Sequence, residues 1–144
     1  MAVLLATGAT AEEVVIDMEV VAGFEGIVRV GATTPFNITL FNRGVEFDGE
    51  LQVIVNVNEI LKAAYAVPVN LQKGSNKQVT VNVPLTSALK KVQVRLVRND
   101  KTILSKTIEL SKVIPPGTPT VGILAGEIQA LRYISGTKLT EMMW

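Results

Sequence analysis

Three carboxylates stand at alternating positions around a glycine, at Glu46, Asp48 and Glu50. Calcium prefers oxygen ligands from a flexible loop, so this run is a candidate cation site. It lacks the longer ligand series of an EF-hand, and a solvated acidic turn explains the same residues without a metal. We therefore predict that these carboxylates bind no metal.

A possible glycosylation sequence and a set of lysines could each have a chemical role, but each also has a simpler structural explanation. Asn37-Ile-Thr39 is formally an acceptor for N-glycosylation, but it lies mid-strand, where an outward-facing polar pair is expected. Scattered lysines could border an anion-binding surface, although lysines at strand ends more often block edge-to-edge aggregation. We favour the simpler interpretation in both cases. The lysines concerned are Lys62, Lys73, Lys77, Lys90 and Lys91.

Three phenylalanines are candidates for a binding surface. Phe24, Phe41 and Phe47 all lie near expected loop tips, where an exposed ring could contact a ligand. The alternative is that they fill the ends of a core. We predict that at least two of the three are buried in this way.

The residue types that are missing exclude most familiar active sites. The chain has 144 residues and contains neither cysteine nor histidine. Cys/His zinc sites, Ser-His-Asp triads, cysteine nucleophiles and disulfides are therefore excluded. Hydrolysis by paired Asp or Glu is formally possible, but no such pair is recognisable. We predict that the protein is not an enzyme and has no catalytic, cofactor-binding or metal residue.

Strands are the elements that must position all of these side chains. The chain is 48% hydrophobic but only 5% aromatic, and its apolar residues are largely Val, Ile, Leu and Ala. From residue 13 to residue 112 apolar and polar residues alternate with a period of two, which is typical of antiparallel sheets with one buried face. The pattern predicts that four valines are almost fully buried: Val53, Val55, Val81 and Val94.

Turn residues divide this region into about eight strands, at the spacing of a β-sandwich. Asn42-Arg-Gly44 and Asp48-Gly49 are expected to separate strands, and Asn99-Asp100 to close a hairpin. Pro68 lies within a strand pattern, which predicts an edge strand or a bulge. Asn58–Ala64 could form one turn of helix. We predict an all-β, immunoglobulin-like antiparallel sandwich of about 7–8 strands.

The remaining segments have a different character. Residues 1–12 have a short apolar run and small residues at 9 and 11, so they are a leader or the remnant of a signal peptide. Residues 13–114 form the predicted sandwich, and residues 115–119 a proline-rich linker. Residues 120–144 begin with an expected strand at 120–125 and a helix at 127–134. They are either the start of a truncated second domain or an appendage on the sandwich.

Three segments carry a resemblance to a known kind of domain: Glu25–Gly31, Thr34–Gly44 and Phe47–Leu51. They resemble the N-terminal immunoglobulin-like module of large bacterial membrane-anchored proteins, and are similar to adhesion-type and carbohydrate-associated modules. The resemblance covers residues 13–134. It implies a cell-surface context and no catalytic residue. In such proteins the module precedes a Rossmann-like or amidotransferase-like domain, which Val121–Leu124 would suit.

These observations predict a non-catalytic, extracytoplasmic structural or interaction module of the bacterial cell envelope. It would be secreted, or anchored to the membrane through a parent protein, and its partner would be an adjacent domain or another cell-surface protein. A net charge of +1 with dispersed basic residues argues against nucleic acid. Two alternatives stay open. One is a carbohydrate- or peptide-binding module, and the other is an accessory domain of an amidotransferase-like parent.

Overall fold

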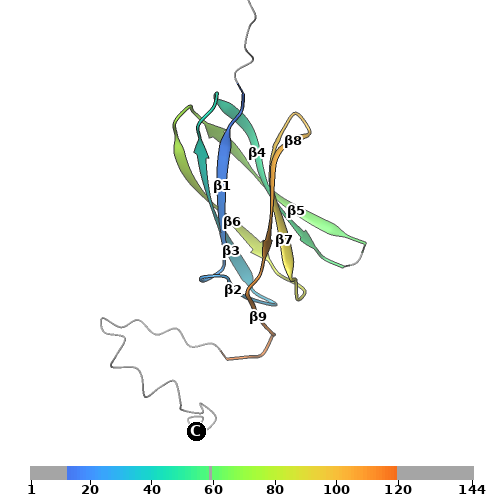
Figure 1. Ribbon diagram of the computed structural model, residues 1–144. Coiled ribbons are helices and arrows are strands. Elements are labelled where there is room, and N and C mark those ends of the chain that lie inside the picture. The colour runs from blue at the N-terminus through green and yellow to red at the C-terminus, as the bar shows by residue number, and fades with distance from the viewer. Residues whose placement is uncertain (1–12, 59, 120–144) are drawn as a thin grey trace, which may run out of the picture.

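The computed structural model describes residues 13–58 and 60–119. Regular structure in these residues is entirely β-strand, arranged as two antiparallel sheets that enclose one apolar core (Figure 1). The predicted all-β sandwich is confirmed. Within the same residues no helix has the length and apolar character that crossing a membrane requires. The expected leader at 1–12 and the expected strand and helix after residue 119 lie outside the described residues.

The first sheet has three strands in the order β1-β3-β6. Val20 on β1 lies opposite Ile38 on β3, and Ile38 lies opposite Val79 on β6. Because the period is two, this register turns the apolar set of all three strands toward the core. The strands are β1 (Ile16–Ala22), β3 (Thr33–Asn42) and β6 (Asn76–Pro84).

The second sheet has four strands in the order β5-β4-β7-β8. Asn99 and Asp100 link β7 to β8 with φ values of 49° and 61°, which is the backbone of a two-residue hairpin turn and confirms the predicted hairpin. Pro68 lies in the edge strand β5, as predicted. The strands are β4 (Phe47–Asn56), β5 (Lys62–Leu71), β7 (Lys91–Arg98) and β8 (Lys101–Glu109).

A small parallel pair closes one end of the sandwich. It consists of β2 (Ile27–Arg29) and β9 (Lys112–Ile114), in which Val28 lies opposite Val113. Residue 13 lies at the opposite end, so the described chain enters the sandwich at one end and leaves it at the other (Figure 1). This parallel pairing was not predicted from the sequence.

The core confirms the predicted alternation at the four valines. Val53 and Val94 are fully buried, while Val55 and Val81 are 3% and 4% exposed. Val53 on β4 pairs directly with Val94 on β7, so these valines also define the register of the second sheet. The four predicted valines are therefore part of the sandwich core.

Two sequence interpretations of the β4 region are wrong. Asp48 and Gly49 do not separate strands, because both lie inside β4. The described residues of the segment 58–64 form no helix: the Asn58 Oδ1 atom accepts hydrogen bonds from the backbone N–H groups of Ile60 and Leu61, and β5 begins at Lys62. An asparagine side chain that bonds its own neighbouring backbone competes with helix formation and favours a turn.

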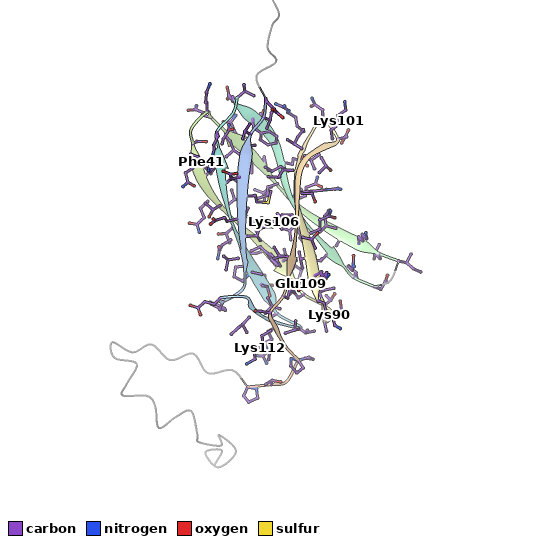
Figure 2. All side chains as sticks on the ribbon, viewed as in Figure 1. Phe41, Lys90, Lys101, Lys106, Glu109 and Lys112 are labelled. Atoms are coloured by element: carbon purple, nitrogen blue, oxygen red, sulfur yellow. The ribbon has the colours of Figure 1, made fainter. Side chains whose placement is uncertain are left out.

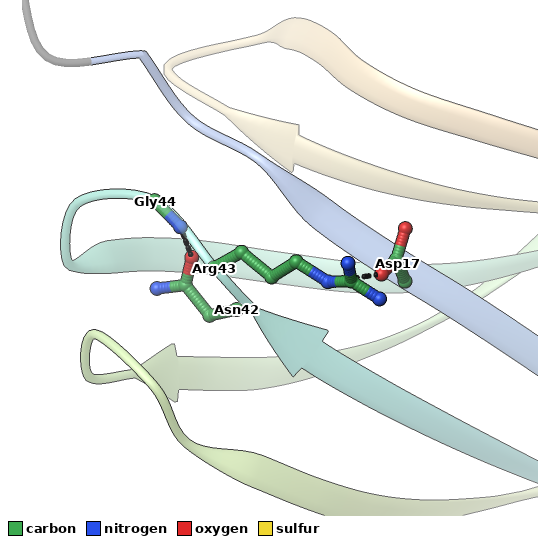
Figure 3. Close-up of polar contacts among 4 residues, drawn as sticks. All are labelled: Asp17, Asn42, Arg43 and Gly44. Atoms are coloured by element: carbon green, nitrogen blue, oxygen red, sulfur yellow. Dashed lines mark hydrogen bonds and ion pairs between the residues drawn. The ribbon is translucent and has the colours of Figure 1, made fainter.

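A fully buried asparagine ties the two sheets together where β3 ends. The Asn42 Nδ2 group donates to the Val45 carbonyl at 2.7 Å and to the Leu71 carbonyl of β5 at 3.0 Å. Its Oδ1 atom accepts from the Gly44 N–H at 3.0 Å (Figure 3). The turn predicted at Asn42–Gly44 is thus present, and the same side chain also links the first sheet to the edge strand of the second.

Candidate interaction site at one end of the sandwich

The three acidic residues point away from the core along the start of β4, and each finds a different environment. Glu46 accepts a hydrogen bond from the Asn70 side chain at 3.2 Å, and Glu50 accepts one from the Gln52 side chain at 3.1 Å. No group of three metal-binding side chains converges within the described residues. The segment is a solvated strand rather than the acidic turn we predicted.

We expect millimolar calcium to leave the melting temperature of the protein unchanged. A ligand that binds only the folded state stabilises it by about 2.7 kcal/mol at a hundredfold excess over its dissociation constant. Glu46 and Glu50 each accept a hydrogen bond from a different amide, and these carboxylates do not converge on one point. A thermal melt with and without calcium is the measurement. An upward shift that disappears in Asp48→Asn would contradict the prediction.

The polar and basic candidates are dispersed over the surface. Asn37 lies on the outer face of β3, where its side-chain oxygen accepts from the Thr80 hydroxyl at 2.8 Å. Lys91 forms an ion pair with Glu109 at 3.1 Å. Lys62 and Lys91 border one shallow hollow of ≈ 240 Å³, and Lys90 and Lys91 border a second one together with Glu109. Lys77 lies on β6 of the other sheet, so the five lysines do not share one surface.

Two lysines bridge the open flanks between the sheets. The Lys77 Nζ atom on β6 donates to the Asn70 carbonyl of the edge strand β5, at 3.4 Å. On the other flank, the Lys106 Nζ atom on β8 donates to the Met18 carbonyl of β1, at 3.0 Å (Figure 2). Each lysine occupies an edge carbonyl that could otherwise pair with another chain, which fits the edge-protecting role predicted for Lys77. The role of Lys106 was missed.

The three phenylalanines do not behave as predicted, because only Phe47 is fully buried. Phe41 is half-buried on the outer face of the first sheet, and the Arg43 guanidinium lies 5.3 Å from its ring centre. Arg43 is held there by an ion pair of 2.8 Å with Asp17 (Figure 3). Phe24 is 81% exposed. It is therefore the only one of the three whose ring is largely open to solvent.

Phe24 borders an apolar groove at the end of the sandwich that carries β2 and β9. The groove has a volume of ≈ 640 Å³, within the range of ligand pockets. Its apolar lining includes Phe24, Ile27, Pro35 and Ile114, and its two charged residues are Arg29 and Lys112. Figure 2 places Lys112 at this end of the molecule. We call this feature the end groove.

Backbone hydrogen bonds hold Phe24 in its exposed position. The N–H of Phe24 donates to the Ile27 carbonyl at 3.1 Å, and the N–H of Ile27 donates to the Phe24 carbonyl at 2.9 Å. Glu25 and Gly26, with φ values of 52° and 84°, form the tight turn between them. A Cβ atom on Gly23 would collide with the Ile27 carbonyl oxygen, so this turn also requires glycine there. The backbone that carries the exposed ring is therefore held by the tight turn.

The sequence indicated this site only in part. It singled out Phe24 as a possible binding residue, but it did not associate this residue with Lys112 and Ile114. Those residues enter the site through the parallel pairing of β2 with β9, which joins segments 85 residues apart at Ile27 and Lys112. Such a pairing has no local sequence signal.

The sequence was compared with curated proteins and with models of protein families. No curated protein matches the sequence. A protein-family model, described as Domain of unknown function (DUF8726), matches residues 15–111. The match includes the strands from β1 to β8 and exceeds half of the 144 residues. The chain therefore belongs to the DUF8726 family of domains of unknown function.

Proposed function

We propose that this sandwich is an immunoglobulin-like, non-catalytic interaction module of the bacterial cell envelope, which serves as a spacer or adaptor beside another domain. The strand order supports the immunoglobulin-like assignment. The chain changes sheets between β3 and β4, between β5 and β6, and between β6 and β7. If the seven long strands are lettered A, B, C, C′, E, F and G, sheet A-B-E packs on sheet C′-C-F-G, which is a seven-strand arrangement of this kind. The envelope context rests on the sequence resemblance.

The end groove is the observation that carries the interaction role. An adaptor needs a surface for its neighbour, and this groove lies where the described chain leaves the sandwich through β9. Its described lining contains no carboxylate that could act as a general acid or base. An apolar concave surface with an exposed aromatic ring is typical of a binding site for another protein segment.

The carbohydrate-binding alternative has less support. Such modules need aromatic rings that are free to stack on sugar, but the Arg43 guanidinium lies over the Phe41 ring and Phe47 is buried. Phe24 alone provides an open ring among these three. The groove around it is apolar rather than rich in side-chain amides, which favours a protein segment as the ligand.

We expect a chain shortened to residues 1–119 to keep its β-sheet circular dichroism spectrum and to melt cooperatively. Among the described residues, the buried core lies between Ile16 and Leu110, so we expect these strands to form a complete core by themselves. Loss of the β spectrum would show that the later residues belong to the sandwich core. In that case the spacer role would be wrong.

The same shortened chain tests the groove with a fluorescent dye that binds exposed apolar surface. We expect dye fluorescence to increase on binding to residues 1–119, and Phe24→Ser to remove most of the increase. Val21→Ser is the matched control, because Val21 is 49% exposed but lies on the outer face of β1. Equal dye binding by the two variants would contradict a binding role for the end groove.

A further inference from the structure

The chain turns back on itself immediately after it lines the end groove. Ile114 is the last residue of β9 and part of the groove wall. The N–H of Thr118 then donates to the Pro115 carbonyl at 3.4 Å, and Gly117 has a φ of 82°. Proline at the second position and glycine with positive φ at the third are typical of a type II β-turn. The turn reverses the direction of the chain directly after Ile114, the last residue that lines the groove.

The sequence that follows this turn is chemically complementary to the groove. Residues 120–126 contain no charge and include Val121, Ile123 and Leu124, and the first charged residue after them is Glu127. The groove has an apolar wall and two cationic residues, Arg29 and Lys112. Neither of these cations forms an ion pair within the described part of the chain. An apolar segment with one adjacent carboxylate is therefore a suitable ligand.

We propose that the end groove is occupied by residues 121–124 of the same chain, with Glu127 near Arg29 and Lys112. This inference rests on the proposed function, since it names the segment that the interaction surface binds. Val121 follows Ile114 by seven residues, which span at most roughly 23 Å when extended. A ligand tethered this closely has a local concentration in the millimolar range, so even a weak contact is populated.

Disulfide cross-linking tests this proposal in the full-length chain, which has no cysteine of its own. In the double variant Phe24→Cys with Ile123→Cys, mild oxidation is expected to join the two positions within one molecule. Peptide mapping by mass spectrometry identifies the bond, and size-exclusion chromatography shows whether the product is a monomer. Ile27→Cys with Ile123→Cys is a second test that leaves the Phe24 ring in place.

The matched control is Ile103→Cys with Ile123→Cys. Ile103 is 38% exposed, almost the same as Ile27 at 37%, but it lies by the β7–β8 turn at the opposite end of the sandwich (Figure 1). We expect several-fold slower bond formation in this control. Glu127→Lys should also slow cross-linking at Phe24→Cys, because it places a third cation beside Arg29 and Lys112.

Two results would overturn the proposal. Equal rates at positions 24 and 103 would mean that the segment has no preferred site. Products joined only between two molecules would mean that a second copy fills the groove. If cross-linking fails while the dye still binds the full-length chain at Phe24, the groove is open to a different partner. The intramolecular proposal is then wrong, but the proposed interaction function stands.

Discussion

Val55→Asp is expected to unfold the domain. Val55 is 3% exposed and faces the core from β4, so the substitution places a carboxylate without a partner among apolar side chains. The cost of burying such a charge consumes most or all of the roughly 5–15 kcal/mol by which a domain of this size is stable. Circular dichroism in buffer should show the loss of the β spectrum.

The neighbouring residue provides the control. Asn56 is exposed at the end of the same strand, so Asn56→Asp should change the free energy of unfolding by less than about 0.5 kcal/mol. Circular dichroism in the same buffer compares the two variants, and urea denaturation measures the small change expected for Asn56→Asp. Comparable destabilisation at the two positions would show that the register of β4 is wrong.

Asn42→Ala is expected to destabilise the domain by about 3 kcal/mol, because each buried polar group left without its partner costs about 1–3 kcal/mol. The Asn42 side chain donates to the Val45 and Leu71 carbonyls and accepts from the Gly44 N–H. Alanine leaves all three without this partner. Urea denaturation is again the measurement. A loss below about 0.5 kcal/mol, as for a typical surface substitution, would show that this side chain does not join the sheets.

Asn42→Asp tests the hydrogen bonds alone, because aspartate has almost the same size as asparagine but lacks the amide group that donates them. An ionised carboxylate at this position would face the Val45 and Leu71 carbonyl oxygens, so the pKa of the introduced carboxyl group should be raised in the folded variant. The folded state then binds the proton more tightly than the unfolded state, in which the pKa of an aspartate is about 3.9. Relative to the wild type, stability should fall as pH rises from that value to the raised pKa. A difference between variant and wild type that is independent of pH would contradict this explanation.

Most of the sandwich could be predicted because burial and strand geometry share one period. Val53, Val55, Val81 and Val94 were placed correctly from alternation alone. Asn99-Asp100 was placed correctly because a two-residue turn with positive φ favours those residue types. In both cases the signal lies within a few residues of the feature that it predicts.

The errors arise where a local signal is ambiguous or absent. Asp48-Gly49 resembles a turn, yet the pairing of β4 with β5 and β7 keeps it extended. Phe24 and Phe47 have the same side chain, but one lies in a tight exposed turn and the other faces the core. The end groove combines β2, β3 and β9, so only the folded chain brings its residues together.

The entry and exit of the chain at opposite ends of the sandwich have a mechanical consequence. Tension between residues 13 and 119 acts along the length of β1, which is paired with β3 through seven consecutive residues. Hydrogen bonds in an antiparallel pair run perpendicular to the strands, so a lengthwise pull shears many of them at once instead of opening them one after another. Forced unfolding is governed by the rate of that rupture rather than by equilibrium stability. The pairing of β1 with β3 is therefore expected to resist a pull along the length of the strands.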